Sequence, residues 1–235
     1  MPKFKITTLG CKVNQAESES IAQELMESEW SPVEDRETAD VYIVNTCTVT
    51  QKASMQSRQA VRQAVRANPH ARILVTGCYA ETTPEEINAI AGVSAIVGHA
   101  QKQNISSMLC SANLDASDFR FSGCRDICSD HDFKLMPLAV TAPRTRPFLK
   151  IQDGCDAFCT YCIVPYARGS SRSMPLAKVM QSINRLAEAG YHEVVLSGIR
   201  WRVCSGCRSL PSPSAQSGWI AGSGGGRCCR RRRIS

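Results

Sequence analysis

Three cysteines in the segment Cys155-Asp-Ala-Phe-Cys159-Thr-Tyr-Cys162 have the types and spacing to hold an iron–sulfur cluster. They form a loop that directly follows the predicted strand 147–151. Three thiolates at this spacing can bind three irons of a cubane [4Fe–4S] cluster and leave the fourth iron without a protein ligand. That open iron can chelate the amino and carboxylate groups of S-adenosylmethionine and pass an electron to its sulfonium. A zinc site would need a fourth Cys or His, and none lies nearby in the sequence.

A second set of three cysteines, Cys11, Cys47 and Cys78, stands earlier in the chain. Each comes shortly after a predicted strand, and the carboxyl ends of parallel strands meet at one edge of a sheet, where ligands bind. Cysteines buried as apolar residues favour strand interiors, whereas these three lie in polar turns. We therefore expect a second three-cysteine cluster at this edge. The three predicted strands span 3–9, 41–45 and 72–76.

The cysteine content of the whole chain favours metal ligation over disulfides. The 235 residues include 13 cysteines, an odd number, and the N-terminus lacks the apolar region of a secretory signal. We expect a cytoplasmic protein, and the cytoplasm keeps thiols reduced. No stretch reaches the roughly 18 apolar residues that a membrane span requires, so no membrane partner is expected.

The elements that must position these cysteines follow a strand–helix alternation. Such alternation predicts βαβ units with a parallel sheet, and therefore the α/β class. In the first helix, Asn14 and Glu17 have the spacing of a capping box, which predicts that the helix begins at Asn14. Further helices are predicted at about 52–67, from Pro84, at about 100–109 and from Pro175 to Gly190, and further strands at 93–97 and 193–197.

Changes of pattern divide the chain into four parts. Residues 1–110 form an N-terminal domain with the first cysteine set, and residues 111–145 lose the alternation and are predicted to be a linker. A second αβ unit occupies residues 146–199. Residues 200–235 have no periodicity and contain no Lys, Asp or Glu, so we expect an irregular, disordered tail.

Both cysteine sets lie in longer motifs, which read Thr8-Leu9-Gly10-Cys11-Lys12-Val13-Asn14, Asn45-Thr46-Cys47-Thr48-Val49-Thr50, Thr76-Gly77-Cys78-Tyr79-Ala80, and Lys150-Ile151-Gln152-Asp153-Gly154-Cys155 through Arg168-Gly169. These motifs resemble the methylthiotransferases, a branch of the radical S-adenosylmethionine superfamily. The resemblance covers residues 3–198. The first motif is most similar to the enzymes that act on N6-threonylcarbamoyladenosine at position 37 of tRNA. The branches that act on isopentenyladenosine-37 of tRNA or on a ribosomal protein are the alternatives.

The resemblance implies two [4Fe–4S] clusters with different tasks. The cluster on Cys155, Cys159 and Cys162 would generate a 5′-deoxyadenosyl radical, which removes hydrogen from C2 of the adenine. The other cluster, held by Cys11, Cys47 and Cys78, would present the sulfur that is attached there. A second S-adenosylmethionine would supply the methyl group.

The resemblance also implies the surroundings of the clusters. The second αβ unit would be the start of a radical S-adenosylmethionine partial barrel. Tyr161 is an aromatic where the family carries one beside the adenine of S-adenosylmethionine, with simple loop packing as the alternative. The implied partners are the tRNA anticodon loop, S-adenosylmethionine and an electron donor, and the oligomeric state stays open.

The sequence departs from this family after Ile199. Arg200-Trp201-Arg202 stand where the family has a His and a glycine-rich loop, and most of the expected barrel is missing. We expect that a shifted reading frame encodes the tail and that the chain is an inactive copy. Four tail cysteines could form a zinc ribbon, but no strand pattern surrounds Cys204, Cys207, Cys228 and Cys229.

Two functions of other classes compete with the enzyme. An iron–sulfur electron carrier would use both clusters without radical chemistry, but such carriers usually ligate all four irons. A basic RNA-binding module would depend on the tail, where the net charge of +7 arises, because residues 1–199 hold 20 basic and 21 acidic residues. Cys110, Cys124 and Cys128 receive no role.

Overall fold

The computed structural model describes residues 1–33, 37–111, 132–140 and 144–200. The predicted linker is therefore described in part. The predicted tail from residue 201 onward, with its four cysteines, lies outside the described residues, as do Cys124 and Cys128.

The N-terminal part of the chain forms a five-stranded sheet in the order β2-β1-β3-β4-β5, and every pairing is parallel. This confirms the predicted parallel sheet and α/β class. The two-residue edge strand β2 is too short to leave a sequence pattern. The strands are β1 (Lys3–Thr8), β2 (Ser31–Pro32), β3 (Val41–Thr46), β4 (Arg72–Gly77) and β5 (Ala95–Val97).

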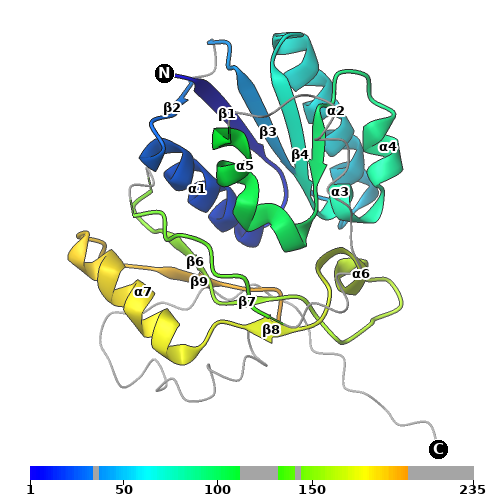
Figure 1. The fold of residues 1–235 in the computed structure, drawn as a ribbon. Helices are drawn as coiled ribbons and strands as arrows, with labels where there is room; N and C mark the ends of the chain where they lie inside the picture. The colour runs from blue at the N-terminus through cyan, green and yellow to red at the C-terminus, as the bar shows by residue number, and fades with distance from the viewer. Residues whose placement is uncertain (34–36, 112–131, 141–143, 201–235) are drawn as a thin grey trace, which may run out of the picture.

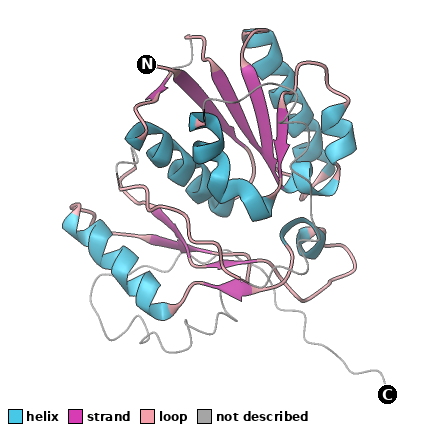
Figure 2. Cartoon of the chain, viewed as in Figure 1, coloured by secondary structure: helices cyan, strands magenta, loops and turns pink. Residues whose placement is uncertain are grey.

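Helices cover both faces of this sheet, as Figure 1 and Figure 2 show. One face is covered by α1 (Lys12–Glu27) and α5 (Ile105–Cys110), which the 3₁₀ helix η1 (His99–Asn104) precedes. The other face is covered by α2 (Gln51–Ala67), α3 (Cys78–Thr82) and α4 (Pro84–Asn88). Every residue of β3 is buried, as expected for the central strand of a sheet that is covered on both sides.

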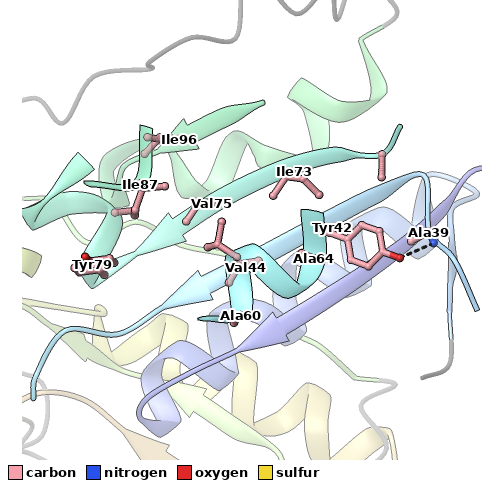
Figure 3. Close-up of a cluster of buried hydrophobic side chains, with 13 residues drawn as sticks. Ala39, Tyr42, Val44, Ala60, Ala64, Ile73, Val75, Tyr79, Ile87 and Ile96 are labelled. Atoms are coloured by element: carbon pink, nitrogen blue, oxygen red, sulfur yellow. Dashed lines mark hydrogen bonds between the residues drawn. The ribbon is translucent and has the colours of Figure 1, made fainter. Parts of the chain in front are cut away.

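Alternating side chains of the central strands build a separate core on each face. Tyr42 and Val44 belong to one buried cluster with Ala60 and Ala64 of α2, as Figure 3 shows. The Tyr42 hydroxyl accepts a hydrogen bond from the backbone N–H of Ala39 at 3.2 Å. On the opposite face, Ile43 packs with residues of α1 and α5. This period-two division of one strand between two cores fixes its register against its neighbours.

A second αβ unit lies beneath the first in Figure 1 and confirms the predicted strand–helix–strand pattern. Strands β6 (Phe148–Lys150) and β9 (Val195–Ser197) pair in parallel, and α7 (Leu176–Glu188) packs against them. A short antiparallel pair, β7 (Gln152–Asp153) with β8 (Arg172–Ser173), and helix α6 (Val164–Arg168) are additions to the prediction.

The first helix corrects one sequence-based expectation. Helix α1 begins at Lys12, with Cys11 as its N-cap residue and no side-chain capping bond. Asn14 and Glu17 therefore do not form the predicted capping box. Both are buried and bond to groups outside the helix instead. The helix begins two residues before the predicted start. The spacing of Asn14 and Glu17 misleads because these side chains form tertiary contacts and no cap.

None of the helices in the described part of the chain is both long and apolar enough to cross a membrane.

Candidate metal centre

The first cysteine set lies at the carboxyl edge of the five-stranded sheet, as predicted. Cys11 stands between β1 and α1, Cys47 directly follows β3, and Cys78 directly follows β4. The strand order places β1 beside β3, with the chain leaving to opposite sides of the sheet from these two strands. Such a switch point opens a crevice at the carboxyl ends of the strands, where doubly wound sheets bind ligands.

The turn that contains Cys11 lies against the turn that contains Cys47, because Gly10 approaches the Cys47 side chain closely. Gly10 has a φ of +97°, and a Cβ atom at this position would lie 2.8 Å from Sγ of Cys47. The glycine therefore provides both the left-handed backbone and the space for the neighbouring thiol. The Cys47 backbone is held by Ser57 of α2, whose hydroxyl accepts from its N–H at 3.1 Å and donates to its carbonyl at 2.8 Å.

Cys78 is buried as the first residue of α3, which corrects the expectation that it lies in a loop. Burial raises the pKa of the Cys78 thiol, and the nearby cations Arg168 and Lys102 act in the opposite direction. Burial outweighs both cations, so the pKa of this thiol stays raised.

The second cysteine set occupies the loop after β7. Cys155 is buried, and Cys159 and Cys162 are half-buried. The N–H of Cys155 donates to the carbonyl of Gly169 at 3.0 Å, which ties the start of this loop to the end of α6. Gly154 has a φ of +68°, and a Cβ there would lie 1.9 Å from the carbonyl oxygen of Ser170. The loop therefore requires glycine before its first cysteine.

Aromatic side chains flank the second set. Tyr161, which directly precedes Cys162, is 84% exposed. Phe158 adopts a φ of +42° and packs edge-on against Tyr166, with ring centroids 5.8 Å apart. Sequence reasoning missed Phe158, because its unusual backbone is a property of the folded loop.

The two cysteine sets lie on elements that touch. Helix α3, which starts at Cys78, packs against α6, which follows Cys162. Figure 1 shows α6 directly below α3 in that view. The contact between α3 and α6 therefore links an element of the first set to an element next to the second set.

The donor chemistry of both cysteine sets suits iron–sulfur clusters, because thiolates are the ligands of such clusters and each cysteine binds a different iron. Throughout the described ranges, no group of three His, Cys, Asp or Glu side chains that could hold a metal ion is found. All six cysteines are free thiols, and each set lies on one edge or loop. This donor set fits two [4Fe–4S] clusters.

A buried network of charges fills the boundary between the units. Its centre is Glu17 of α1, which is 2% exposed. The Glu17 carboxylate accepts from Lys102 at 2.6 Å, from Lys150 at 2.7 Å and from Arg168 at 3.0 Å. Asp153, next to the second cysteine loop, accepts from Lys150 at 2.9 Å and from Arg168 at 2.8 Å.

The charges of the network hold one another ionised. Burial alone would raise the pKa of Glu17, but Arg168, Lys102 and Lys150 outweigh it and hold this pKa well below its usual range. Burial would likewise lower the pKa of the Arg168 guanidinium, but Asp153 and Glu17 raise it well above its usual value. The network is therefore a set of buried but mutually satisfied ions.

This network is the main feature that sequence reasoning missed. A lone arginine after a cysteine loop is usually solvated, whereas Arg168 is fully buried here. Glu17 lies 151 positions earlier in the chain, so no local pattern pairs the two residues. The only local signal is a charged residue at an inward-facing position of an otherwise regular helix, as Glu17 is in α1.

Comparison with solved structures places the fold in a class. The chain is similar to the radical S-adenosylmethionine methyltransferase TsrM from Kitasatospora setae, whose structure holds cobalamin and a [4Fe–4S] cluster. The similarity has a TM-score of 0.52 at 14% sequence identity and covers 86% of this chain and 50% of the other. At this identity the likeness concerns the fold. The two chains thus share an α/β sheet domain followed by a second αβ unit.

Comparison of sequences finds similar proteins of one kind. Residues 3–98 match the Uncharacterized protein family UPF0004. The threonylcarbamoyladenosine tRNA methylthiotransferase MtaB of Bacillus subtilis is 42% identical over 192 residues, which are 82% of this chain and 42% of the relative. Its counterpart in Aquifex aeolicus is 36% identical and covers 83% of this chain and 47% of the relative. The chain is a homologue of these methylthiotransferases, which confirms the resemblance seen in the motifs.

A more distant relative carries the alternative specificity. The tRNA-2-methylthio-N(6)-dimethylallyladenosine synthase of Erythrobacter litoralis is 32% identical and covers 83% of this chain and 44% of the relative. The chain spans less than half the length of these relatives.

Proposed function

We propose that this chain takes part in radical S-adenosylmethionine methylthiolation of tRNA, with N6-threonylcarbamoyladenosine at position 37 as the modified nucleoside. The observation that carries the proposal is the pair of cysteine sets on contacting elements, α3 and α6, of a chain homologous to methylthiotransferases. The higher identity to the threonylcarbamoyladenosine enzymes supports this nucleoside over the dimethylallyl one.

In this proposal each of the two units of the chain binds one cluster. Residues 1–110 hold one [4Fe–4S] cluster through Cys11, Cys47 and Cys78. Residues 146–199 hold the other through Cys155, Cys159 and Cys162, with 111–145 as the connection. When bound, the second cluster supplies the electron that cleaves S-adenosylmethionine.

The protein's own groups prepare these sites. Gly10 and Gly154 give the turns that present the first cysteine of each set, and Ser57 fixes the backbone of Cys47. In this proposal Tyr161 stacks on the adenine of S-adenosylmethionine, and the exposure of its side chain supports that role. An electron donor and the tRNA anticodon loop complete the proposed partners. We place the reaction in the cytoplasm, because the seven described cysteines are all free thiols.

The cluster assignment is tested by anaerobic reconstitution and iron analysis. We expect about eight irons per parent chain, and about four when either set is replaced by alanine. Cys110→Ala is the matched control, because this exposed cysteine ends α5 and belongs to neither set. Unchanged iron in both triple variants would contradict the assignment.

The activity is tested with reductant, S-adenosylmethionine and tRNA that carries threonylcarbamoyladenosine. Mass spectrometry of the digested tRNA should show a nucleoside heavier by one methylthio group in place of hydrogen. The product should disappear in both triple-alanine variants and persist in Cys110→Ala. Two loaded clusters without product would overturn the proposed activity and support the sequence-based expectation of an inactive copy.

A further inference from the structure

Arg168 contacts both units of the chain through one buried guanidinium. Its side chain is 1% exposed. Nη1 donates to Oδ1 of Asp153 at 2.8 Å and to Oε1 of Glu17 at 3.0 Å, and Nη2 donates to Oδ1 of Asn14 at 2.5 Å. Two of these acceptors belong to α1 in the first unit and one belongs to the second unit.

From Arg168 a chain of hydrogen bonds continues to the first cysteine set. The Asn14 amide, which accepts from Arg168, donates through Nδ2 to the carbonyl of Leu9 at 2.7 Å and to the carbonyl of Thr46 at 3.0 Å. Thr46 directly precedes Cys47, and Leu9 stands two residues before Cys11. A single side chain therefore holds both turns to Arg168.

A matching path leads to the second cysteine set. Oδ1 of Asp153, which accepts from Arg168, also accepts from the N–H of Gly154 at 2.9 Å. Gly154 directly precedes Cys155, whose own N–H donates to the carbonyl of Gly169 at 3.0 Å. Arg168 thus contacts the second loop in two ways: its side chain binds Asp153, and the next residue in the chain, Gly169, accepts from Cys155.

We propose that Arg168 is a positioning residue that fixes the Cys155 loop against the turns of Cys11 and Cys47, and thereby sets the placement of the two clusters. The part that concerns clusters rests on the proposed function, whereas the bonding path is a property of the chain alone. A planar guanidinium suits this task because its fork of donors can satisfy several acceptors in fixed directions. An ammonium cannot reproduce that geometry.

Lys102 provides a control matched for burial and charge. It is a buried cation of the same network, but its partners Glu17 and Asn45 both belong to the first unit. Loss of Lys102 removes a buried cation without cutting the path between the units. A purely structural role of buried charge predicts the same outcome for Lys102→Met as for Arg168→Gln.

The first experiment measures the magnetic interaction between the clusters by electron paramagnetic resonance of the reduced, reconstituted full chain. We expect splitting from two nearby clusters in the parent and in Lys102→Met. Arg168→Gln and Arg168→Lys should keep their iron but lose the splitting. Splitting that persists unchanged in Arg168→Gln would overturn the inference.

The second experiment needs no cluster and compares amide hydrogen exchange in the metal-free full chain. We expect Arg168→Gln to accelerate exchange about tenfold in peptides covering 9–14, 46–49 and 153–156 together, as for local opening of one shared contact. Lys102→Met should leave 153–156 at the parent rate. Acceleration confined to 153–156 in Arg168→Gln would refute the positioning role, whatever iron the parent binds. Iron analysis of the parent judges the proposed function separately.

Discussion

At the residue scale, Glu17 is a buried carboxylate that pairs with several cations at once. Three cations, Lys102, Lys150 and Arg168, converge on its two oxygens at 2.6 to 3.0 Å. The contribution of Glu17 to stability therefore depends on the unpaired cations that remain when its charge is removed.

Replacement of this carboxylate by an amide should be costly. We expect Glu17→Gln to lower the free energy of unfolding by about 3–5 kcal/mol, because the buried Lys102 and Arg168 and the half-buried Lys150 lose their common anion. Glu37→Gln is the control, since Glu37 pairs with Lys3 at an exposed position and should cost at most about 1 kcal/mol. Urea denaturation of the metal-free chain measures both, and equal effects would contradict the expectation.

A buried histidine makes stability depend on pH. Burial, followed by the cations Lys102 and Arg168, holds the pKa of His99 well below its usual range. Its Nε2 is buried and has no hydrogen-bond partner. The folded protein therefore keeps His99 neutral where the unfolded chain, with an ordinary pKa of about 6.5, takes up a proton.

The sign of the pH effect follows from that difference. Because the unfolded state binds more protons, the free energy of unfolding should fall as pH drops below about 6.5, by up to about 1.4 kcal/mol per pH unit. His99→Phe should remove this part of the slope between pH 6.5 and 5. The exposed His70 provides the control His70→Gln. Urea titrations at each pH give the slopes, and an unchanged slope in His99→Phe would refute this cause.

At the element scale, hydrophobic patterns predicted most strands and helices but not their polar contacts. The apolar run 41–45 marks β3 because that strand is buried on both faces. Asn14 and Glu17 misled the capping prediction, since a local spacing cannot reveal bonds to residues of another unit. The first cysteine set could be proposed because strand ends share one edge, and the second because its spacing is local. The contacts of Arg168 could not be predicted, because its partners are set by the packing of the units.

The turn before Cys155 gives a prediction for one loop. Gly154→Ala would place a Cβ 1.9 Å from the backbone oxygen of Ser170, in a left-handed conformation. We expect this variant to displace the loop, to lose the iron of the second cluster and to cost several kcal/mol of stability, about 3 or more. Iron analysis and urea denaturation measure these effects.

Gly190→Ala provides the control for that loop. Gly190 has a similar φ of +89°, but a Cβ there meets nothing within 4 Å. This variant should cost about 1 kcal/mol and keep all its iron, because only the backbone preference changes. Equal iron loss in both variants would show that the left-handed backbone, and not the close approach, determines the result.

At the scale of the whole molecule, helix α1 belongs to two packing arrangements at once. Its apolar side chains, such as Ile21 and Leu25, complete one core of the first sheet. Its polar face, with Asn14 and Glu17, meets β6 and α6 of the second unit. The two units therefore share α1, which packs against the first sheet on one side and against the second unit on another.

A shared helix predicts that the units open together. We expect amides of β6 and β3 to exchange through openings of equal free energy in mild urea, because β6 cannot separate without exposing Glu17 and Lys150. Hydrogen exchange followed by mass spectrometry measures both strands. In Glu17→Gln the free energies of opening of β6 and β3 should differ, with the lower value for β6. A lower value for β6 in the parent would argue against this coupling.

The distance of 151 residues between Glu17 and Arg168 also bears on synthesis. Chains grow at about 5–20 residues per second, so Glu17 waits roughly 8–30 s on the ribosome before Arg168 is made. Lys102 is made well before then, and its contact with Glu17 lies entirely within the first unit. We expect this early partner to neutralise the carboxylate while the first sheet assembles. The nascent first unit thus carries a half-complete charge site that stays open to the segment still to come.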